Sequence, residues 1–475
     1  MGPKLAAFVV AFVVGAPPAP PAPSTRRGNP LGWRRIQKAF LPTRFDMIQA
    51  LTQAAFDRLA GPVAENDLPP EIQQREPANF LRHVGALIQT KTADGLVDPK
   101  LVLSWLLTQG GAGAVFVGLL VPIREAGALL PQLFVSDRIR RMKQRKWAWS
   151  GGAAVQGLAA LGLGLAGLTL SGPALGVAIC AALTLLAVAR SVCSASHKDV
   201  LGRTIAKGRR GAVGGLAGSI AAGAVLLFAA VLLSGLAPRK ALVLGALALA
   251  ALLWLGAAAL MSGLAEPSAP AKEDASSGLH AALGQLHHLR RDPRLARFVV
   301  ARGLLTATAL APPYIVLMAG EGAKGALKGD LGAMVLASSL AALASSYVWG
   351  RMADRSSRRV LILSGLMGAC GMALALGLGA AGAMATLWAP ALVLFVLNLA
   401  HQGVRLGRST YLVDMAKDDL RTAYTSVANT VIGVLLLASG AFGALAAIGG
   451  PAVTLALFAA MALAAAWVAR GLPEA

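Results

Sequence analysis

The chain has 475 residues, of which 56% are hydrophobic and 14% charged, and its mean hydropathy is +0.64. Such values exclude an ordinary soluble domain, and apolar runs of near-membrane length, enough to cross a bilayer core of about 30 Å, recur from residue 101 onward. The formal charge of +22 could indicate a nucleic-acid-binding protein, but the basic residues cluster in alternate short loops between the apolar runs. We therefore expect an all-α integral membrane protein rather than a nucleic-acid-binding protein or a soluble helical bundle, whose helices would show polar faces.

The N-terminal region, residues 1–45, contains no acidic residue. An apolar run over 5–16 precedes a Pro-rich stretch and then a basic stretch over 26–44. The run is short for a membrane span and is typical of a signal-peptide core, whereas the basic stretch is typical of a transit peptide. The region therefore predicts a possible targeting leader for an organelle (plastid) membrane, and a cytoplasmic tail is the alternative.

Residues 46–78 form an N-terminal polar and amphipathic segment. The spacing of Phe45, Ile48, Leu51 and Phe56 predicts a helix that lies on the membrane surface. The stretch 61–77 is polar and contains prolines, which favours a loop.

The first membrane span is polar, and hydropathy alone starts it near residue 101. The second half of the chain gives the expected distance from the start of its first span to the loop aspartate. That span begins about 58 residues before Asp354. The same distance before Asp137 predicts a first span over 79–107. The alternative is that residues 80–98 form a helix at the membrane surface.

The remaining apolar runs predict eleven further spans, which makes twelve transmembrane helices in all. They fall into an N-terminal six-helix half (79–262), a central loop (263–294) with an amphipathic helix over 279–290, a C-terminal six-helix half (295–470) and a short tail (471–475). The predicted spans after the first are 112–135, 147–169, 172–192, 211–235, 240–262, 295–319, 329–349, 360–381, 386–406, 422–447 and 450–470.

The charges of the connecting loops set the topology. The loops after the second, fourth and eighth spans are basic, whereas the loops on the other side carry few charges. Both ends of the helical core therefore belong on the positive side, which is the cytoplasm or an organelle interior such as the stroma.

The stretch Gly350–Arg359, which reads GRMADRSSRR, is short, basic and turn-like between two apolar runs. It resembles the G-x-L-A-D-R-x-G-R-R loop signature of the major facilitator superfamily, with Ser357 in place of the second glycine. A weaker copy lies at Leu133–Arg141, where Asp137 stands 217 residues before Asp354. The resemblance covers about residues 79–470 and implies two six-helix pseudo-repeats related by an axis along the membrane normal.

The resemblance also implies a gating role for this loop and its weaker copy. A partly desolvated ion pair there would form in one conformation and break in the other. The predicted gating residues are Gly350, Arg351, Asp354, Arg355, Arg358, Arg359, Asp137, Arg138 and Arg141. The alternative is a charge cluster that only sets the topology.

Charged side chains at membrane depth are costly, so they usually face a cavity or a partner. The candidates for a central cavity, or for coupling to protons, are Lys91, Asp94, Asp98, Arg124, Glu125, Arg302, Asn398, His401 and Arg405. In one interpretation Asp94 or Glu125 carries a coupling proton and an arginine meets an anionic substrate. In the other, Lys91 pairs with Asp94 and Arg124 with Glu125, and the charges only hold helices together.

These observations predict a secondary active transporter that moves a small molecule, such as an organic anion or metabolite, by alternating access. No cofactor, metal or catalytic motif is evident, so an enzyme is not expected. The expected partners are the substrate and the lipid bilayer, and the resemblance implies a monomer. The alternative function is a transport-inactive membrane scaffold or sensor that binds partners through residues 45–78.

Overall fold

The computed structural model describes residues 44–61, 67–268, 284, 286–322, 330–353, 355–415 and 421–474. The predicted leader up to residue 43, most of the predicted helix over 279–290, and Asp354 lie outside them. Every regular element in these ranges is helical. Eight helices among the described residues are long and apolar enough to cross a membrane, and two further apolar helices are shorter. The chain is an integral membrane protein.

The N-terminal half follows two short helices at its start, α2 (Arg44–Leu59) and α3 (Pro70–Gln73). Within the half, α8 packs against α9 and α11, and α4 packs against α10 and α11. The first span is therefore part of the bundle and not a surface helix. Its helices are α4 (Glu76–Val97), α5 (Val102–Gln109), α6 (Ala114–Leu129), α7 (Gln132–Arg140), α8 (Lys146–Thr169), α9 (Gly172–Thr204), η3 (Lys207–Arg209), α10 (Arg210–Ser234) and α11 (Arg239–Ser262).

The C-terminal half repeats this plan after the short helix α13 (His287–Arg291). Here α19 packs against α17 and α18, and α21 packs against α14 and α18. The backbone of α21 turns at Gly450, whose φ of 82° is the left-handed conformation that glycine permits, so the predicted last span over 450–470 starts at this kink. The helices are α14 (Pro293–Leu305), α15 (Ala307–Leu310), α16 (Pro312–Gly322), α17 (Asp330–Ala353), α18 (Ser357–Ala380), η4 (Ala383–Ala385), α19 (Trp388–Met415), α20 (Arg421–Ala438) and α21 (Ala441–Arg470).

Several helices run beyond the spans that hydropathy predicts. The helix α9 continues to Thr204 and α19 to Met415, so residues predicted as loop are helical. The start of the stretch predicted as a loop, Gly350–Ala353, is likewise the last turn of α17. Hydropathy reports which residues suit lipid, whereas a helix continues into water wherever its backbone hydrogen bonds continue.

The first helix of each half is interrupted. In the N-terminal half residues 98–101 separate α4 from α5, so the predicted continuous span over 79–107 is wrong at this point. Pro99 removes a backbone donor and restricts Asp98 before it, which explains the break. In the C-terminal half short breaks at Thr306 and Ala311 divide α14, α15 and α16.

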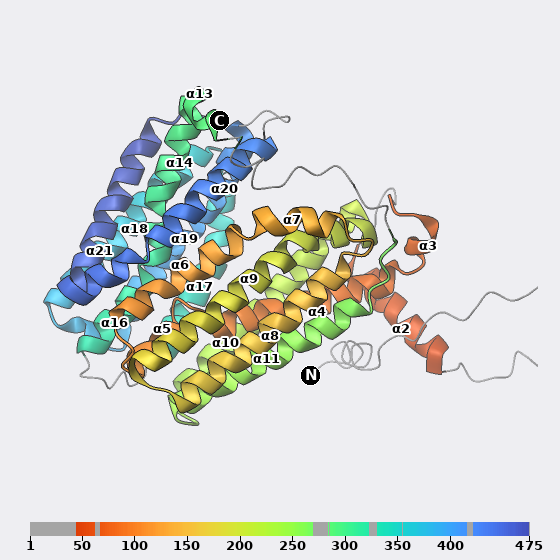
Figure 1. Cartoon of the computed structure of the whole chain (residues 1–475), viewed down its shortest axis with the longest axis horizontal. Coiled ribbons are helices and arrows are strands. Elements are labelled where there is room, and N and C mark those ends of the chain that lie inside the picture. Colours follow the sequence, from red (N-terminus) through yellow and green to blue (C-terminus); the bar gives the residue numbers. More distant parts are fainter. Residues whose placement is uncertain are drawn as a thin grey trace, which may run out of the picture.

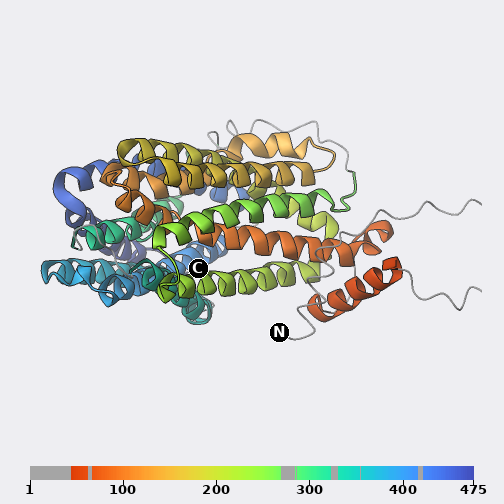
Figure 2. The same ribbon diagram turned by 90° about the horizontal axis from the view of Figure 1, so that it is seen from below.

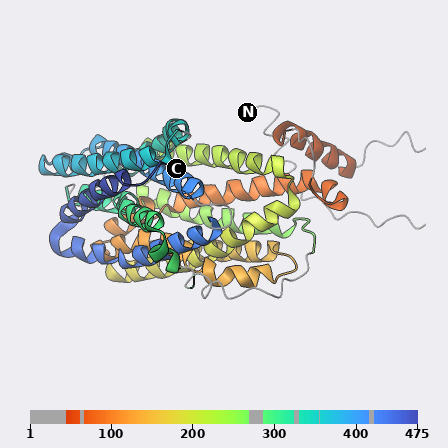
Figure 3. The same ribbon diagram turned by 90° about the horizontal axis from the view of Figure 1, so that it is seen from above.

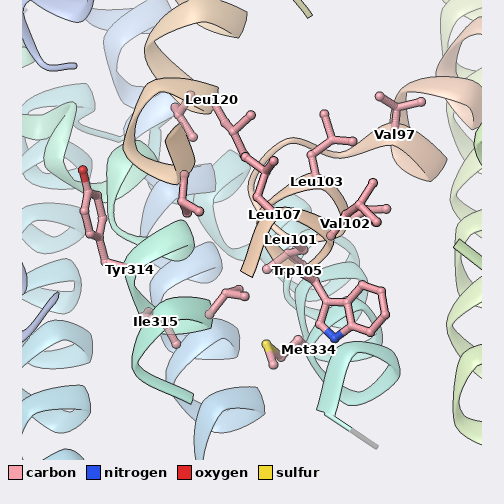
Figure 4. Close-up of a cluster of buried hydrophobic side chains, with 14 of the residues drawn as sticks. Val97, Leu101, Val102, Leu103, Trp105, Leu107, Leu120, Tyr314, Ile315 and Met334 are labelled. Carbon is pink, nitrogen blue, oxygen red and sulfur yellow. The ribbon is translucent and has the colours of Figure 1, made fainter. Parts of the chain in front are cut away.

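The two halves meet at one end and diverge toward the end that carries α7 and α13 (Figure 1). At the joined end, α5 packs against α16, and one large cluster of buried apolar side chains includes residues of both helices. Figure 4 shows Trp105 of α5 beside Met334 of α17, and Leu107 of α5 and Ile315 of α16 belong to the same apolar cluster. The helices α6 and α21 also touch there, since a Cβ on Gly118 would lie 2.4 Å from Cα of Gly443.

A four-residue sequence repeats after the last helix of each half. Gly263–Glu266 reads G-L-A-E and Gly471–Glu474 reads G-L-P-E, 208 residues later. Glu266 Oε2 accepts a hydrogen bond of 2.8 Å from the backbone N–H of Lys146, the first residue of α8. Glu474 Oε2 accepts one of 2.7 Å from the hydroxyl of Ser356, which caps α18. We call these two segments the G-L-x-E tails.

The N-terminal segment packs on its own chain. The helices α2 and α3 lie at the far end of α4 (Figures 2 and 3). Phe56 of α2 contacts Phe80 of α4 edge-to-face, with ring centroids 5.4 Å apart. Arg209 of η3 forms an ion pair of 2.9 Å with Glu76, and Arg210 one of 3.0 Å with Asp67. The segment therefore clamps the connection between α9 and α10.

Candidate functional site

A cavity of about 490 Å³ lies between the two halves. Its volume is within the range of about 300–1,000 Å³ that is usual for small-molecule sites. Residues around both helix breaks line it, Asp98–Leu101 in the first half and Leu305–Thr306 in the second. The apolar cluster of Figure 4 closes the joined end, and the halves diverge on the other side of the cavity.

The wall from the N-terminal half neutralises much of its own charge. Asp94 of α4 accepts a hydrogen bond of 2.6 Å from Nη2 of Arg124 on α6 and forms a second ion pair with Arg190 on α9. Only about a fifth or less of the Asp94 and Arg124 side chains is exposed. One carboxylate therefore ties three helices together, because such a pair in low dielectric is costly to break.

The break in the first helix is closed by local hydrogen bonds. Asp98 Oδ1 accepts a hydrogen bond of 2.9 Å from the backbone N–H of Lys100. The Ser104 hydroxyl donates one of 2.8 Å to the carbonyl oxygen of Pro99. These bonds satisfy groups that the missing helical turn leaves free, and they hold the Lys100 side chain toward the cavity.

A chain of hydrogen bonds joins the two halves at this point. Lys100 Nζ lies 3.3 Å from Nε2 of His401 on α19, and His401 Nδ1 lies 3.1 Å from the Thr308 hydroxyl on α15. Since an ammonium group can only donate, Nε2 accepts and Nδ1 carries the proton. The Thr308 hydroxyl in turn donates to the carbonyl of Leu305 at 2.9 Å. The two interrupted helices are thus connected through His401.

The wall from the C-terminal half carries arginines without carboxylates. Arg302 of α14 donates a hydrogen bond of 2.9 Å to the neutral amide of Asn429. Arg405 and Arg408 are three residues apart on α19 and so lie on the same face of the helix. Among the described residues neither guanidinium has a hydrogen-bond or ion-pair partner. Asn398, also on α19, donates to the Ser338 hydroxyl of α17 at 3.0 Å.

Glu125 of α6 lines the cavity and faces these cations. In the described part of the chain it has no hydrogen bond and no ion pair, but it interacts electrostatically with Lys100, Arg405 and Arg408. It is therefore a carboxylate that is free to change partner. The predicted pair Arg124–Glu125 is not formed, because Arg124 turns to Asp94.

The cavity brings together most of the residues predicted to line it. They are Asp94, Asp98, Arg124, Glu125, Arg302, Asn398, His401 and Arg405. Lys91 is an exception, because it donates to the carbonyl of Gly214 on α10 at 3.1 Å and does not line the cavity. The predicted pair of Lys91 with Asp94 is likewise replaced by the two arginine pairs.

The predicted gating residues are spread along the positive end. Arg138, Arg141, Arg351, Arg355 and Arg359 are exposed, and Gly350 lies in α17. Arg358 pairs with Glu474 and donates to the carbonyl of Leu472 at 3.1 Å. Asp137 lies in α7, but its side chain, like all of Asp354, is outside the described residues. Their gating role remains a prediction.

The candidates chosen from the sequence left out three cations that line the cavity, namely Lys100, Arg190 and Arg408, although Arg190 stands out as a charge at the end of the fourth predicted span. Arg408 could have been found, since it lies seven residues after His401 and three after Arg405 on one helix face. Lys100 follows Pro99, and a proline inside a polar span is a signal for a break.

The chain matches no protein-family model, and no curated protein matches its sequence. Solved structures do match. A POT family transporter in complex with a thioalcohol-conjugated peptide gives a TM-score of 0.63 at 11% identity, over 82% of this chain and 95% of that one. The nucleoside transporter NupG (D323A mutant) gives 0.62 at 14%, over 83% and 100%. The xylose transporter XylE from E. coli, in an inward open conformation, gives 0.58 at 13%, over 85% and 97%.

The chain has the major facilitator fold. At these identities the likeness concerns the architecture, namely the helix order and the placing of a cavity between two halves. The comparison does not extend to the cavity side chains, so the chemistry of the cavity follows from the contacts within this chain. Among the described residues no group of three or more His, Cys, Asp or Glu side chains could hold a metal ion.

Proposed function

We propose that the chain is a secondary transporter that moves a small organic anion across a membrane by alternating access. The observation that carries the proposal is the charged cavity between the halves, which touches the break in the first helix of each half. Interrupted helices in corresponding positions of two repeats are the usual sign of a transport site, because they expose backbone groups and charges at mid-membrane depth. Transport by the proteins of similar structure supports the same proposal.

The orientation follows from the loop charges. The end at which the halves diverge carries the basic loops, so it faces the cytoplasm or an organelle interior. The structure then corresponds to an inward-facing state, with the apolar cluster of Figure 4 as the closed outer gate. A plastid membrane is one possible destination, which Edman sequencing of the mature protein tests, since an intact Met1 would exclude a cleaved leader.

Proton coupling is part of the proposal, and Glu125 is the better candidate for the coupling site. Asp94 is held by two arginines, so protonating it would leave both without a carboxylate. Glu125 has no such partner among the described residues. Its partial burial at membrane depth favours the protonated form of its carboxyl, and the nearby cations favour the ionised form. Transport should therefore respond to Glu125→Gln in its dependence on a proton gradient.

The test is a thermal-shift screen of the full chain against a metabolite panel at pH 5.5 and 7.5, because a ligand of the folded state raises its Tm. Each stabilising compound is then assayed for uptake into proteoliposomes. Uptake that falls at least about tenfold in Arg124→Gln and is kept in the exposed control Glu71→Gln supports the proposal. Stabilisation without any uptake would favour the scaffold or sensor instead.

The scaffold alternative assigns partner binding to residues 45–78. Part of that segment is already occupied by its own chain, through Glu76 with Arg209 and Asp67 with Arg210. A phenotype that is caused by deletion of α2 and not by any of the cavity variants would support the scaffold function. We propose a monomer, which light scattering in detergent tests.

A further inference from the structure

The cavity has more positive than negative charge. Three acidic side chains, Asp94, Asp98 and Glu125, line it. When all nine groups are ionised, the cavity therefore has an excess of three positive charges, because six cations also line it. These cations are Lys100, Arg124, Arg190, Arg302, Arg405 and Arg408. An excess of this kind at membrane depth is unfavourable unless an anion from outside the chain offsets it.

The excess is concentrated on one side. Asp94 is shared by Arg124 and Arg190, and Asp98 accepts from the backbone of its own turn. The C-terminal half supplies three arginines to the lining and no carboxylate. Arg302 and Arg408 are close enough to repel each other, as are Arg405 and Arg408. Glu125 alone faces this group from the opposite wall.

The arrangement of these arginines suits two anionic groups. Arg405 and Arg408, adjacent on one face of α19, can hold one carboxylate or phosphate, since a guanidinium binds such groups through two parallel hydrogen bonds. Arg302 lies on a different helix, α14, and has only a neutral partner, Asn429, so it can hold a second group. Lys100 reaches in from the other half beside His401.

We propose that the cavity takes a small molecule with at least two negative charges, such as a dicarboxylate or a phosphate ester, held by Arg405 and Arg408 at one group and by Arg302 at the other. This inference rests on the proposed function, in which this cavity is the transport site. A singly charged or neutral molecule would leave the arginines of the C-terminal half partly unneutralised.

The test measures binding to the full chain in detergent at constant ionic strength. Succinate is compared with monomethyl succinate, and glycerol 3-phosphate with glycerol, by the concentration that gives half of the maximal rise in Tm. We expect the doubly charged member of each pair to act at a concentration at least about tenfold lower, a difference that corresponds to about 1.4 kcal/mol. Arg405→Gln and Arg408→Gln should each remove that preference, whereas the exposed Arg290→Gln should keep it.

The variants are first checked by size-exclusion chromatography and by their Tm without ligand, so that a misfolded protein is not scored as a loss of binding. Arg405→Lys keeps the charge but not the paired donors, and it should keep part of the preference. Equal shifts from the two members of a pair would overturn the inference. A preference that survives in the double variant Arg405→Gln with Arg408→Gln would overturn it as well. Shifts from none of the charged probes would also count against it, since unpaired cations bind simple dianions even when these are not the cargo.

The failure of this inference is distinguishable from the failure of the proposed function. Neutral or cationic compounds that stabilise the protein and enter proteoliposomes would leave transport intact and remove the charge requirement. Conversely, a dianion that binds in a manner dependent on Arg405 and Arg408, but is never taken up or exchanged, would keep the site and contradict transport.

Discussion

The N-terminal half (76–266) and the C-terminal half (293–474) repeat the same supporting contacts at their positive ends. In each, a G-L-x-E tail holds the start of the third span, α8 or α18. Lys146 Nζ of α8 donates to the carbonyl of Leu264 at 2.7 Å, and Arg358 Nη1 of α18 donates to the carbonyl of Leu472 at 3.1 Å. In each, the first helix is interrupted at the cavity. The cavity walls do not repeat, because one carries acids that neutralise its arginines and the other does not.

This difference separates the contacts that support the fold from those that the proposed function assigns to binding. Contacts that hold a helix end have the same task in both halves, so residues of the same kind suit both halves. A binding site between two halves meets different parts of its ligand on each side, and its charges can therefore differ. Four comparisons of variants test this separation.

The largest effect is expected from Asp94→Asn. The substitution leaves Arg124 and Arg190 facing each other without a carboxylate, and removing one partner of a partly buried pair destabilises by on the order of 3 kcal/mol. Arg302→Gln, which loses a bond to a neutral amide, should lose only about 1 kcal/mol. Chemical denaturation in detergent measures both.

A double variant tests whether the loss of stability in Asp94→Asn comes from the unneutralised arginines. Adding Arg124→Gln to Asp94→Asn removes one of the stranded guanidiniums, so it should restore part of the lost stability. Asp94→Asn as stable as the unmodified chain would show that the N-terminal wall is not neutralised by this carboxylate, and the comparison of the two walls would fail.

The next effect is on the balance between conformations. Lys100 bonds across the halves to His401, and in the proposed transport cycle this bond has to break when the cavity opens to the other side. Lys100→Met should therefore weaken the inward-facing state by about 1.5 kcal/mol, roughly a tenfold shift in populations. The populations are measured with the substitution Thr306→Cys in a Cys370→Ser background. The rate at which an impermeant maleimide labels this cysteine is measured from the side of the membrane opposite the basic loops.

Lys91→Met is the matched control for this shift. The Lys91 ammonium also bonds a carbonyl, that of Gly214, but both groups belong to the N-terminal half. Its loss should leave the labelling unchanged. Equal labelling in the two methionine variants would mean that the contact with His401 does not favour either state.

The sequence predicted the plan of the fold well, because a lipid bilayer requires each span to be a long apolar helix. The charges of the loops are a second, independent signal for the same order of spans. The first span, although polar, was placed by the spacing of Asp137 and Asp354, and α4 and α5 lie there. The break at Pro99 was missed, because the span was treated as one helix. The ends of α9 and α19 were placed too early, because polar residues continue a helix outside lipid.

The site was predictable as a set of residues but not as a set of contacts. Charges at membrane depth are few, so Asp94, Glu125 and Arg302 could be selected from their position alone. Helical spacing could not show that Lys91 turns toward α10 while Asp94, three residues later, turns toward α6 and α9. That choice depends on which helices are neighbours, and one sequence does not contain this information.

A smaller effect separates the two G-L-x-E tails. The Glu266 side chain is fully buried, whereas 49% of the Glu474 side chain is exposed. Glu266→Gln should therefore destabilise by about 2 kcal/mol, the range for a buried charged hydrogen bond, and Glu474→Gln should destabilise by clearly less because water screens its pair. Thermal unfolding of each variant measures this, and the opposite order would contradict the burial argument.

The smallest effect concerns pH at the surface. The backbone N–H of Lys207 donates to Asp67 at 3.0 Å, and this bond, together with Arg210, holds the pKa of the Asp67 carboxyl below its ordinary value. A lowered pKa in the folded state means that the contribution to stability is present above the unfolded-state pKa and is lost as the pH falls below about 4. Because 46% of the side chain is exposed, that contribution should stay under about 1 kcal/mol.

Hydrogen exchange of α2 and α3 between pH 3 and 6, corrected for intrinsic rates, measures this contribution. The unmodified chain should lose protection in these helices toward pH 3 and keep it in α8, whose start is held by the fully buried Glu266. In Asp67→Asn protection of α2 and α3 should be lower throughout and should depend less on pH. An unchanged pH profile in that variant would mean that the clamp on η3 is held by Phe56 and Arg209 rather than by the carboxylate, since the Arg209 guanidinium lies 4.6 Å from the centre of the Phe56 ring.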